Sequence, residues 1–372
     1  MAFGQSVIWP KLAGPPGERW LWGRRSDFAW IAGGGFFAFV VVAFPLSFWA
    51  PSAPLLTTAF LHLAIVCNYP HYGATYETIV RERVAKPRAF RTLLVSTPIM
   101  IALAALVASF PDLLWAPVLR LYLCWSMHHY AAQNFGISAM WAGRSGKPLD
   151  GREKSLLQFA FLGLGVFLIV VSNTAGGDPE SAAKVVGLAD NGGKIPIANL
   201  PDSVYPLALV LAAACCGAFA LAERSRRARI GAGFDRATWL LFLTSLAWFV
   251  VPAIRLPGSG EPWMWPGLRL ALLGAPPFFH CAQYLAVVGH RDRQTSDVRP
   301  IVLFSMLVFG SFALFHGPPA VLPRIFPIDS LRAILLVVAV INLHHFWLDG
   351  VMWRRPKKAV ALSPATASAP AV

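Results

Sequence analysis

Histidines recur in four apolar stretches of this sequence, and each is followed four positions later by another polar residue. The stretches are NYPHYGATY around His71, MHHYAAQNFG around His129, FFHCAQYL around His280 and NLHHFWLDG around His345. The polar residues at that spacing are Thr75, Gln133, Tyr284 and Asp349. Residues four apart share one face of a helix. Each stretch therefore presents an imidazole and a hydrogen-bonding group side by side.

This arrangement is typical of a metal centre. Imidazole is the commonest transition-metal ligand, and its second ring nitrogen usually donates to a carboxylate or another acceptor. The pair His345 and Asp349 has that form. We expect the metal ligands to be His71, His129, His280 and His345. We expect Tyr284 and Asp349 to act on the substrate, and Thr75, Gln133 and Asn134 to orient the ligands.

Two of the four stretches contain adjacent histidines, so the ligand in each remains open. The choice is between His128 and His129, and between His344 and His345. Neighbours differ by about 100° around a helix, so only one of each pair faces the site. The polar residue four positions on favours His129 and His345. The alternative for any single histidine is a hydrogen bond between packed helices, without a ligand.

The elements that position these residues are predicted to be membrane-spanning helices. Of the 372 residues, 56% are hydrophobic and only 13% are charged, which is too apolar for a soluble globular domain. Several apolar runs reach the roughly 20 residues that cross the hydrocarbon. The formal charge of +14 does not indicate nucleic-acid binding, because Lys and Arg accumulate in the cytoplasmic loops of membrane proteins. The sequence predicts an all-α, multi-pass membrane bundle that contacts membrane lipids.

About ten spans account for the apolar runs. We place a cytoplasmic N-terminal segment at 1–27, the transmembrane domain at 28–355 and a disordered cytoplasmic tail at 356–372. Every Lys/Arg-rich loop then falls on one side, so both termini are predicted to be cytoplasmic, in the inner (cytoplasmic) membrane. The predicted spans are 28–50, 55–76, 92–110, 113–142, 156–172, 204–223, 237–254, 268–289, 301–316 and 330–353.

The four histidine stretches fall on the second, fourth, eighth and tenth spans, which all run in the same direction. Each histidine precedes its basic loop by about ten to fifteen residues, which is roughly 15–22 Å along a helix. The four imidazoles are therefore predicted to form one layer, in or near the cytoplasmic half of the membrane.

Oxygen chemistry suits such a site. Histidines, a carboxylate and open positions are typical of non-haem iron that acts on O₂. A site inside the membrane gives an apolar lipid or isoprenoid direct entry from the bilayer. Copper and haem remain open as cofactors, copper because Cys67, Cys124 and Cys281 lie in the same helices. A haem electron-transfer protein, a transporter or proton relay, and a non-catalytic scaffold are the alternative functions.

The motifs resemble those of the Brp/Blh-type β-carotene dioxygenases, membrane enzymes that bind non-haem iron through four histidine boxes. That family's Pro-His-Gly box is similar to Pro70-His71-Tyr72-Gly73, its His-Phe-Gly box with a later Asp-Phe to His129-Tyr130-Ala131 and Asn134-Phe135, and its Phe-x-His box to Phe278-Phe279-His280. Its last box, a His followed by an Asp, is similar to His344/His345 and Asp349. The resemblance covers about forty residues and implies iron and oxygen chemistry.

The sequence also departs from that family. The acidic position of the first box is not acidic here, the second box has Asn134, and a second histidine of the third box is replaced by Tyr284. The resemblance therefore implies the class of chemistry and leaves the substrate open.

Overall fold

The computed structural model is helical throughout the part of the chain that it describes. The described residues are 20–46, 48, 55, 59, 62–174, 200–255, 268, 272, 274–295 and 300–353. They contain no strand beyond one isolated bridge between Thr174 and Leu200. The predicted all-α architecture is confirmed for these residues. Residues 1–19 of the predicted N-terminal segment and the predicted tail 356–372 lie outside them.

Eight helices, each of 13 residues or more, contribute residues to the site or support the helices that do. In chain order they are α4 (Tyr69–Arg81), α5 (Pro87–Ser109), α6 (Pro111–Arg144), α7 (Gly151–Ser172), α9 (Val204–Ile230), α12 (Pro276–Thr295), α13 (Pro300–Ile325) and α14 (Ser330–Met352). The remaining elements of the described fold are α1 (Arg24–Ser26), π-helical η1 (Asp27–Ile31), α2 (Gly34–Leu46), π-helical η2 (Ala64–Asn68), α10 (Arg236–Phe249) and the 3₁₀ turn η4 (Val251–Ala253).

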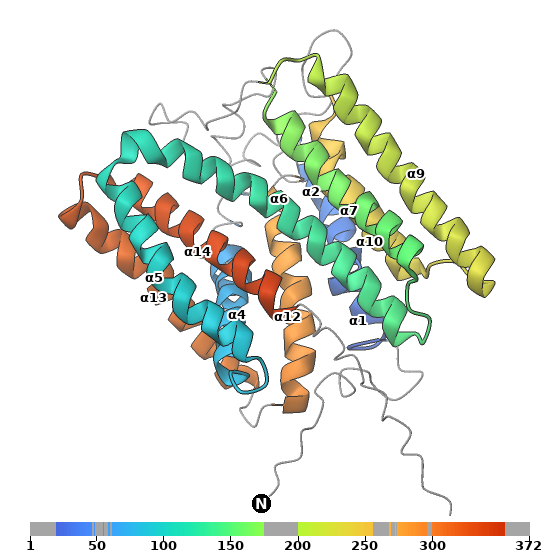
Figure 1. Cartoon of the computed structure of the whole chain (residues 1–372), viewed down its shortest axis with the longest axis horizontal. Coiled ribbons are helices and arrows are strands. Elements are labelled where there is room, and N and C mark those ends of the chain that lie inside the picture. The colour runs from blue at the N-terminus through green and yellow to red at the C-terminus, as the bar shows by residue number, and fades with distance from the viewer. Residues whose placement is uncertain are drawn as a thin grey trace, which may run out of the picture.

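The helices form two groups that meet at α12 (Figure 1). In one group α7 packs along α9 and also contacts α6 and α10. In the other, α14 packs against α5, α13 and α4, and also reaches α6. The helix α12 contacts both α4 and α6. Elements that are far apart in the sequence thus surround α14 and α12.

Local signals explain where the helices begin. Proline opens α5, α6, α12 and α13, where its missing N–H costs nothing. Asp150 begins α7 with a capping box, in which its side chain accepts from the Glu153 backbone N–H and the Glu153 side chain accepts in return. Asp329 caps α14 through the Arg332 backbone N–H.

Six helical segments of the described chain are long and apolar enough to cross a membrane. They are Pro87–Ser109, Gly151–Ser172, Val204–Ile230, Arg236–Ala253, Val302–Ile325 and Ser330–Met352, and the bent pair Arg24–Ile31 with Gly34–Pro45 makes a seventh if it counts as one span. Large apolar side chains point outward, as at Val41 (71% exposed) and Phe309 (73% exposed). A multi-pass membrane protein follows from these helices, whereas the ten predicted spans are not confirmed.

Three of the histidine-bearing helices, α4, α6 and α12, are not among those six. The helix α4 has 13 residues, fewer than the 18 required of a span, and in α6 and α12 polar residues lower the mean hydropathy. Polar residues of all three helices face the interior: His71, Asn134 and His280 are each exposed by 1% or less. A polar lining inside an apolar shell is the expected result for a bundle with an internal site.

Candidate metal centre

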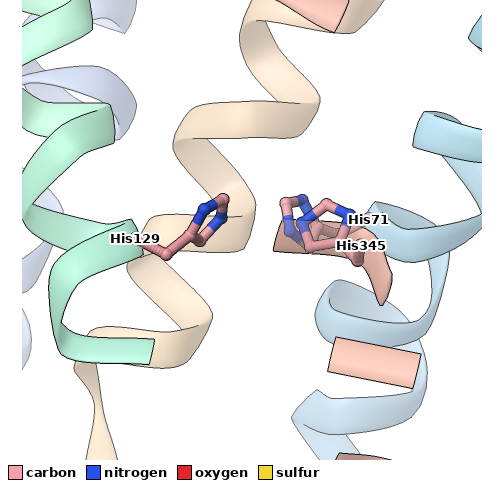
Figure 2. Close-up of side chains that lie close together, drawn as sticks. All are labelled: His71, His129 and His345. Atoms are coloured by element: carbon pink, nitrogen blue, oxygen red, sulfur yellow. The ribbon is translucent and has the colours of Figure 1, made fainter. Parts of the chain in front are cut away.

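The four histidine stretches meet inside the molecule. His71 lies on α4, His129 on α6, His280 on α12 and His345 on α14. One ring nitrogen from each of His71, His129 and His345 lies within 4.8 Å of the other two. Figure 2 shows the His129 ring directed across the interior toward those of His71 and His345. Three nitrogens at this separation can bind one ion.

His280 lies against the same group. Its ring centroid is 5.1 Å from that of His71 and 4.8 Å from that of His129. The ring of His345 is 4.4 Å from that of His71 and 5.2 Å from that of His129. Residues up to 274 positions apart in the chain, from His71 to His345, are thus packed into one cluster of imidazoles.

The imidazoles are buried, yet many of their nitrogens have no hydrogen-bond partner. His71 and His280 are 1% exposed, His345 is fully buried and His129 is 9% exposed. The unpartnered atoms are Nδ1 of His71, Nε2 of His129, and both ring nitrogens of His280 and His345. A buried polar atom left unpaired costs about 1–3 kcal/mol. A cation that accepts the lone pairs would remove this cost at several atoms together, so the residues fit a metal ion.

Asp349 approaches the cluster with its two oxygens in different surroundings. Its Oδ1 accepts hydrogen bonds from Thr75 Oγ1 and Tyr284 Oη, both at 3.2 Å, and these two hydroxyls are 2.6 Å apart. Its Oδ2 lies 3.4 Å from His345 Nε2 and 3.9 Å from His129 Nε2. The carboxylate is therefore anchored on one side and faces the histidines on the other.

The structure separates the two pairs of adjacent histidines. His128 is exposed on the outside of α6, while His129 faces the cluster. His344 points away from the cluster between α4 and α5, where its Nδ1 lies 3.0 Å from Tyr76 Oη and its Nε2 lies 2.7 Å from Ser96 Oγ. Both nitrogens of His344 are thus hydrogen-bonded. The predicted alternatives His128 and His344 are not brought to the cluster, because a step of one residue turns the side chain by about 100°.

Two of the residues predicted to orient the ligands form hydrogen bonds to neighbouring helices and not to the histidine rings. Gln133 Nε2 donates to the backbone carbonyl of His280 and to Gln283 Oε1, both at 3.0 Å. Asn134 Nδ2 donates to Ser245 Oγ on α10 at 2.8 Å. Only Thr75, of the three, reaches a group at the cluster, through Asp349.

Further polar contacts beside the cluster were not predicted. Tyr72 Oη donates to Asn342 Oδ1 at 2.5 Å, which ties α4 to α14 one turn from the histidines. Cys281 Sγ donates to Asn68 Oδ1 at 3.0 Å and so points away from the imidazoles. A lone Asn in an apolar run was the available signal for the first contact. Nothing in the sequence indicates the second.

A buried charged group closes the end of the bundle nearest Asp349. Glu82 binds Arg291 of α12 and lies 3.3 Å from Lys86 Nζ. The two cations flank the ring of Trp353, at 5.4 Å for Lys86 Nζ and 5.9 Å for the Arg291 guanidinium. Burial lowers the pKa of Lys86 to about 8, an effect that the Asp349 carboxylate opposes.

Comparison of the chain with protein-family models, with curated proteins and with solved structures finds no match. The histidine cluster is therefore the feature from which we infer a function.

Proposed function

We propose that this protein is a membrane-embedded, metal-dependent oxygenase or related oxidoreductase that acts on an apolar lipid or isoprenoid. The observation that carries the proposal is the convergence of four buried imidazoles with unpartnered nitrogens from four helices. Helices that position such groups toward a bundle core are a recurrent way to build a metal site. The bound metal would supply activation of O₂, and the chain would supply binding, orientation and exclusion of water.

Non-haem iron fits the donors best among the cofactors considered. The described residues at the cluster offer imidazole nitrogens and a carboxylate, which suit iron, whereas the thiol of Cys281 is turned toward Asn68. A bis-histidine haem, as in an electron-transfer protein, needs two opposed axial nitrogens with a flat macrocycle between them. Here the ring centroids of His71 and His129 each lie 4.4–5.2 Å from those of His280 and His345. This close packing leaves room for a single ion and not for a porphyrin between the rings.

An apolar substrate suits the surroundings of the site. Phe346 stacks on His129 with the ring centroids 4.3 Å apart, and Tyr72 lies 5.0 Å from the ring of His345. Both are rings that pack well against hydrocarbon. A site enclosed by long apolar helices would let such a substrate enter from the bilayer. We further propose that the chain has ten spans with both termini in the cytoplasm, since this orientation places all Lys/Arg-rich loops on one side.

The first test is metal analysis of purified protein. Wild-type protein should contain about one iron per chain, without the Soret band of a haem. His129→Ala should lose most of the metal, whereas the matched control His128→Ala, on the exposed face of the same helix, should retain it. Folded wild-type protein that binds no transition metal would overturn the proposal.

The second test addresses the reaction. Iron-loaded protein in lipid nanodiscs is incubated with a membrane lipid extract under ¹⁸O₂, and apolar products are analysed by mass spectrometry. Label should enter a product with wild-type protein and not with His129→Ala. Metal-loaded protein that consumes no O₂ and labels no product would rule out an oxygenase.

A further inference from the structure

The Asp349 side chain divides its two oxygens between different tasks. Oδ1 accepts from two hydroxyls, Thr75 Oγ1 and Tyr284 Oη, each at 3.2 Å. Oδ2 is directed at the imidazole cluster, and Asp349 is only 5% exposed, so bulk water does not solvate this oxygen well. A carboxylate fixed through one oxygen presents the other in a defined direction.

The distances at Oδ2 differ from those of a hydrogen bond. A charge-assisted N–H···O contact is about 2.7–2.9 Å long, whereas Oδ2 lies 3.4 Å from His345 Nε2 and 3.9 Å from His129 Nε2. Atoms that each lie about 2.1 Å from one ion, at angles of about 90–135°, are separated by roughly 3.0–3.9 Å. Both contacts therefore match those between neighbouring ligands of one ion.

A purely orienting role for Asp349 explains less. In that arrangement the carboxylate accepts the N–H of one histidine, on the nitrogen that does not bind the metal. Here Oδ2 faces Nε2 atoms of two rings from two helices, and neither atom has a hydrogen-bond partner. One ion between these three atoms accounts for all of them together.

We infer that Asp349 Oδ2 is a direct ligand of the metal, beside His129 and His345, and that Tyr284 and Thr75 are positioning residues that hold Oδ1. The inference rests on the proposed function, because it requires that the cluster binds a metal. It also restricts the identity of the metal. An anionic oxygen donor among imidazoles favours Fe(II) or Mn(II) over Cu(I), which prefers sulfur ligands.

Infrared difference spectroscopy tests this assignment on the full-length protein in detergent. The chelated protein is loaded with Co(II), a spectroscopic probe for Fe(II), and its spectrum is compared with that of the metal-free protein. A carboxylate that becomes a ligand shifts its stretching bands. We expect the shift in wild-type protein and in Asp349→Glu, and its loss in Asp349→Asn, along with a change in the Co(II) d–d bands. His128→Ala is the matched control and should behave as wild type.

The positioning residues give a second readout. Tyr284→Phe and Thr75→Val should each still bind about one Co(II) per chain, with an affinity about 10–100-fold lower and a displaced carboxylate band. Tyr76→Phe also removes a hydroxyl from α4, but one that contacts His344, and should leave the band unchanged.

The outcomes separate the two proposals. Stoichiometric Co(II) binding without any carboxylate shift, or with the same shift in Asp349→Asn, would overturn Asp349 as a ligand and leave the histidine site intact. No Co(II) or iron binding by folded wild-type protein would overturn the metal site itself.

Discussion

His344 and His345 are adjacent in α14 and both are buried, yet their surroundings assign them opposite roles. Both ring nitrogens of His344 are hydrogen-bonded, to Tyr76 and Ser96. Both ring nitrogens of His345 have no partner. His344 thus holds α14 between α4 and α5 at the rotation that turns His345 into the cluster.

This contrast predicts two different defects. His345→Ala should remove most of the bound metal, because it deletes a ligand. His344→Ala should retain about one metal per chain but unfold more easily, by about 2–4 kcal/mol, since it removes the partner of the buried Ser96 hydroxyl and of the half-buried Tyr76 hydroxyl and opens a cavity. Metal analysis and thermal unfolding in detergent check both variants. Loss of metal from His344→Ala at a temperature where the protein is folded would contradict this division.

At the residue scale, spacing predicted much of the candidate site. The residue four positions after His345 is the one whose carboxylate faces it, and Tyr284 and Thr75 do meet at that carboxylate. The same rule misplaced Gln133, which binds the backbone of α12 instead of a ring. Ser96 could not have been found, because it is 248 residues from His344 and its role depends on how α5 packs.

Helix packing controls the position of His129. Gly165 of α7 lies against α6, where an added Cβ would be 3.0 Å from the Met127 carbonyl oxygen and 3.1 Å from the Ala131 Cβ. These two residues flank His129 in the chain. The short side chain at 165 therefore permits the close approach of α6 that brings His129 to the cluster.

A larger residue at this position should act on the metal site from a distance. Gly165→Leu should move α6 outward and lower metal affinity at least tenfold, although no ligand is changed. Gly136→Leu is the matched control, because an added Cβ at that exposed position of α6 meets nothing within 4 Å. Metal titration measures the affinities of the two variants and tests this prediction. Equal affinities would show that α6 tolerates the displacement.

Lys86, which lies beside Glu82 after the end of α4, should make the stability of the protein depend on pH. The pKa of Lys86 is lowered to about 8 in the folded protein, whereas an unperturbed lysine titrates near 10.5. Between these values the unfolded chain binds more protons, so this group makes stability rise with pH from about 8 to about 10.5. Its full destabilising effect is present below pH 8.

Lys86→Met should therefore flatten that part of the stability profile. The comparison is between thermal unfolding midpoints of the variant and of wild type at pH 7.5 and at pH 10. Lys154→Met serves as a control, because Lys154 is exposed in the first turn of α7. A wild-type difference between the two pH values that Lys86→Met leaves unchanged would assign the effect to other groups.

Element boundaries were predictable where local chemistry decides them. Pro111 opens α6 close to the start of the predicted span at 113, and Asp150 caps α7. Other boundaries depend on tertiary packing. The π-helical turn Ala64–Asn68 lies within the predicted second span before α4, and a bend at Ala275 separates α12 from the helical residues at 268, 272 and 274 in the predicted eighth span. A periodic pattern of apolar residues carries no information on such a turn.

At the scale of the whole molecule, the cluster joins the two helix groups. Its histidines come from α4 and α14 in one group, from α6 in the other, and from α12 between them. The apolar core is divided in a similar way, with separate buried clusters around α7 and α9 and around α5 and α14. A metal at the cluster would therefore link the two helix groups, which do not share one continuous apolar core among the described residues.

Metal removal should consequently destabilise the whole molecule. A ligand that binds only the folded state stabilises it by about 2.7–4.1 kcal/mol at 100 to 1,000 times its dissociation constant. For a chain of 372 residues, chelation should therefore lower the thermal midpoint by roughly 3–5 °C. Added Fe(II) should restore it. In His345→Ala the midpoint should respond to neither treatment, because the ion is no longer held. A midpoint of the wild-type protein that chelation leaves unchanged, after loss of metal is verified by elemental analysis, would mean that the four helices are held together without the ion.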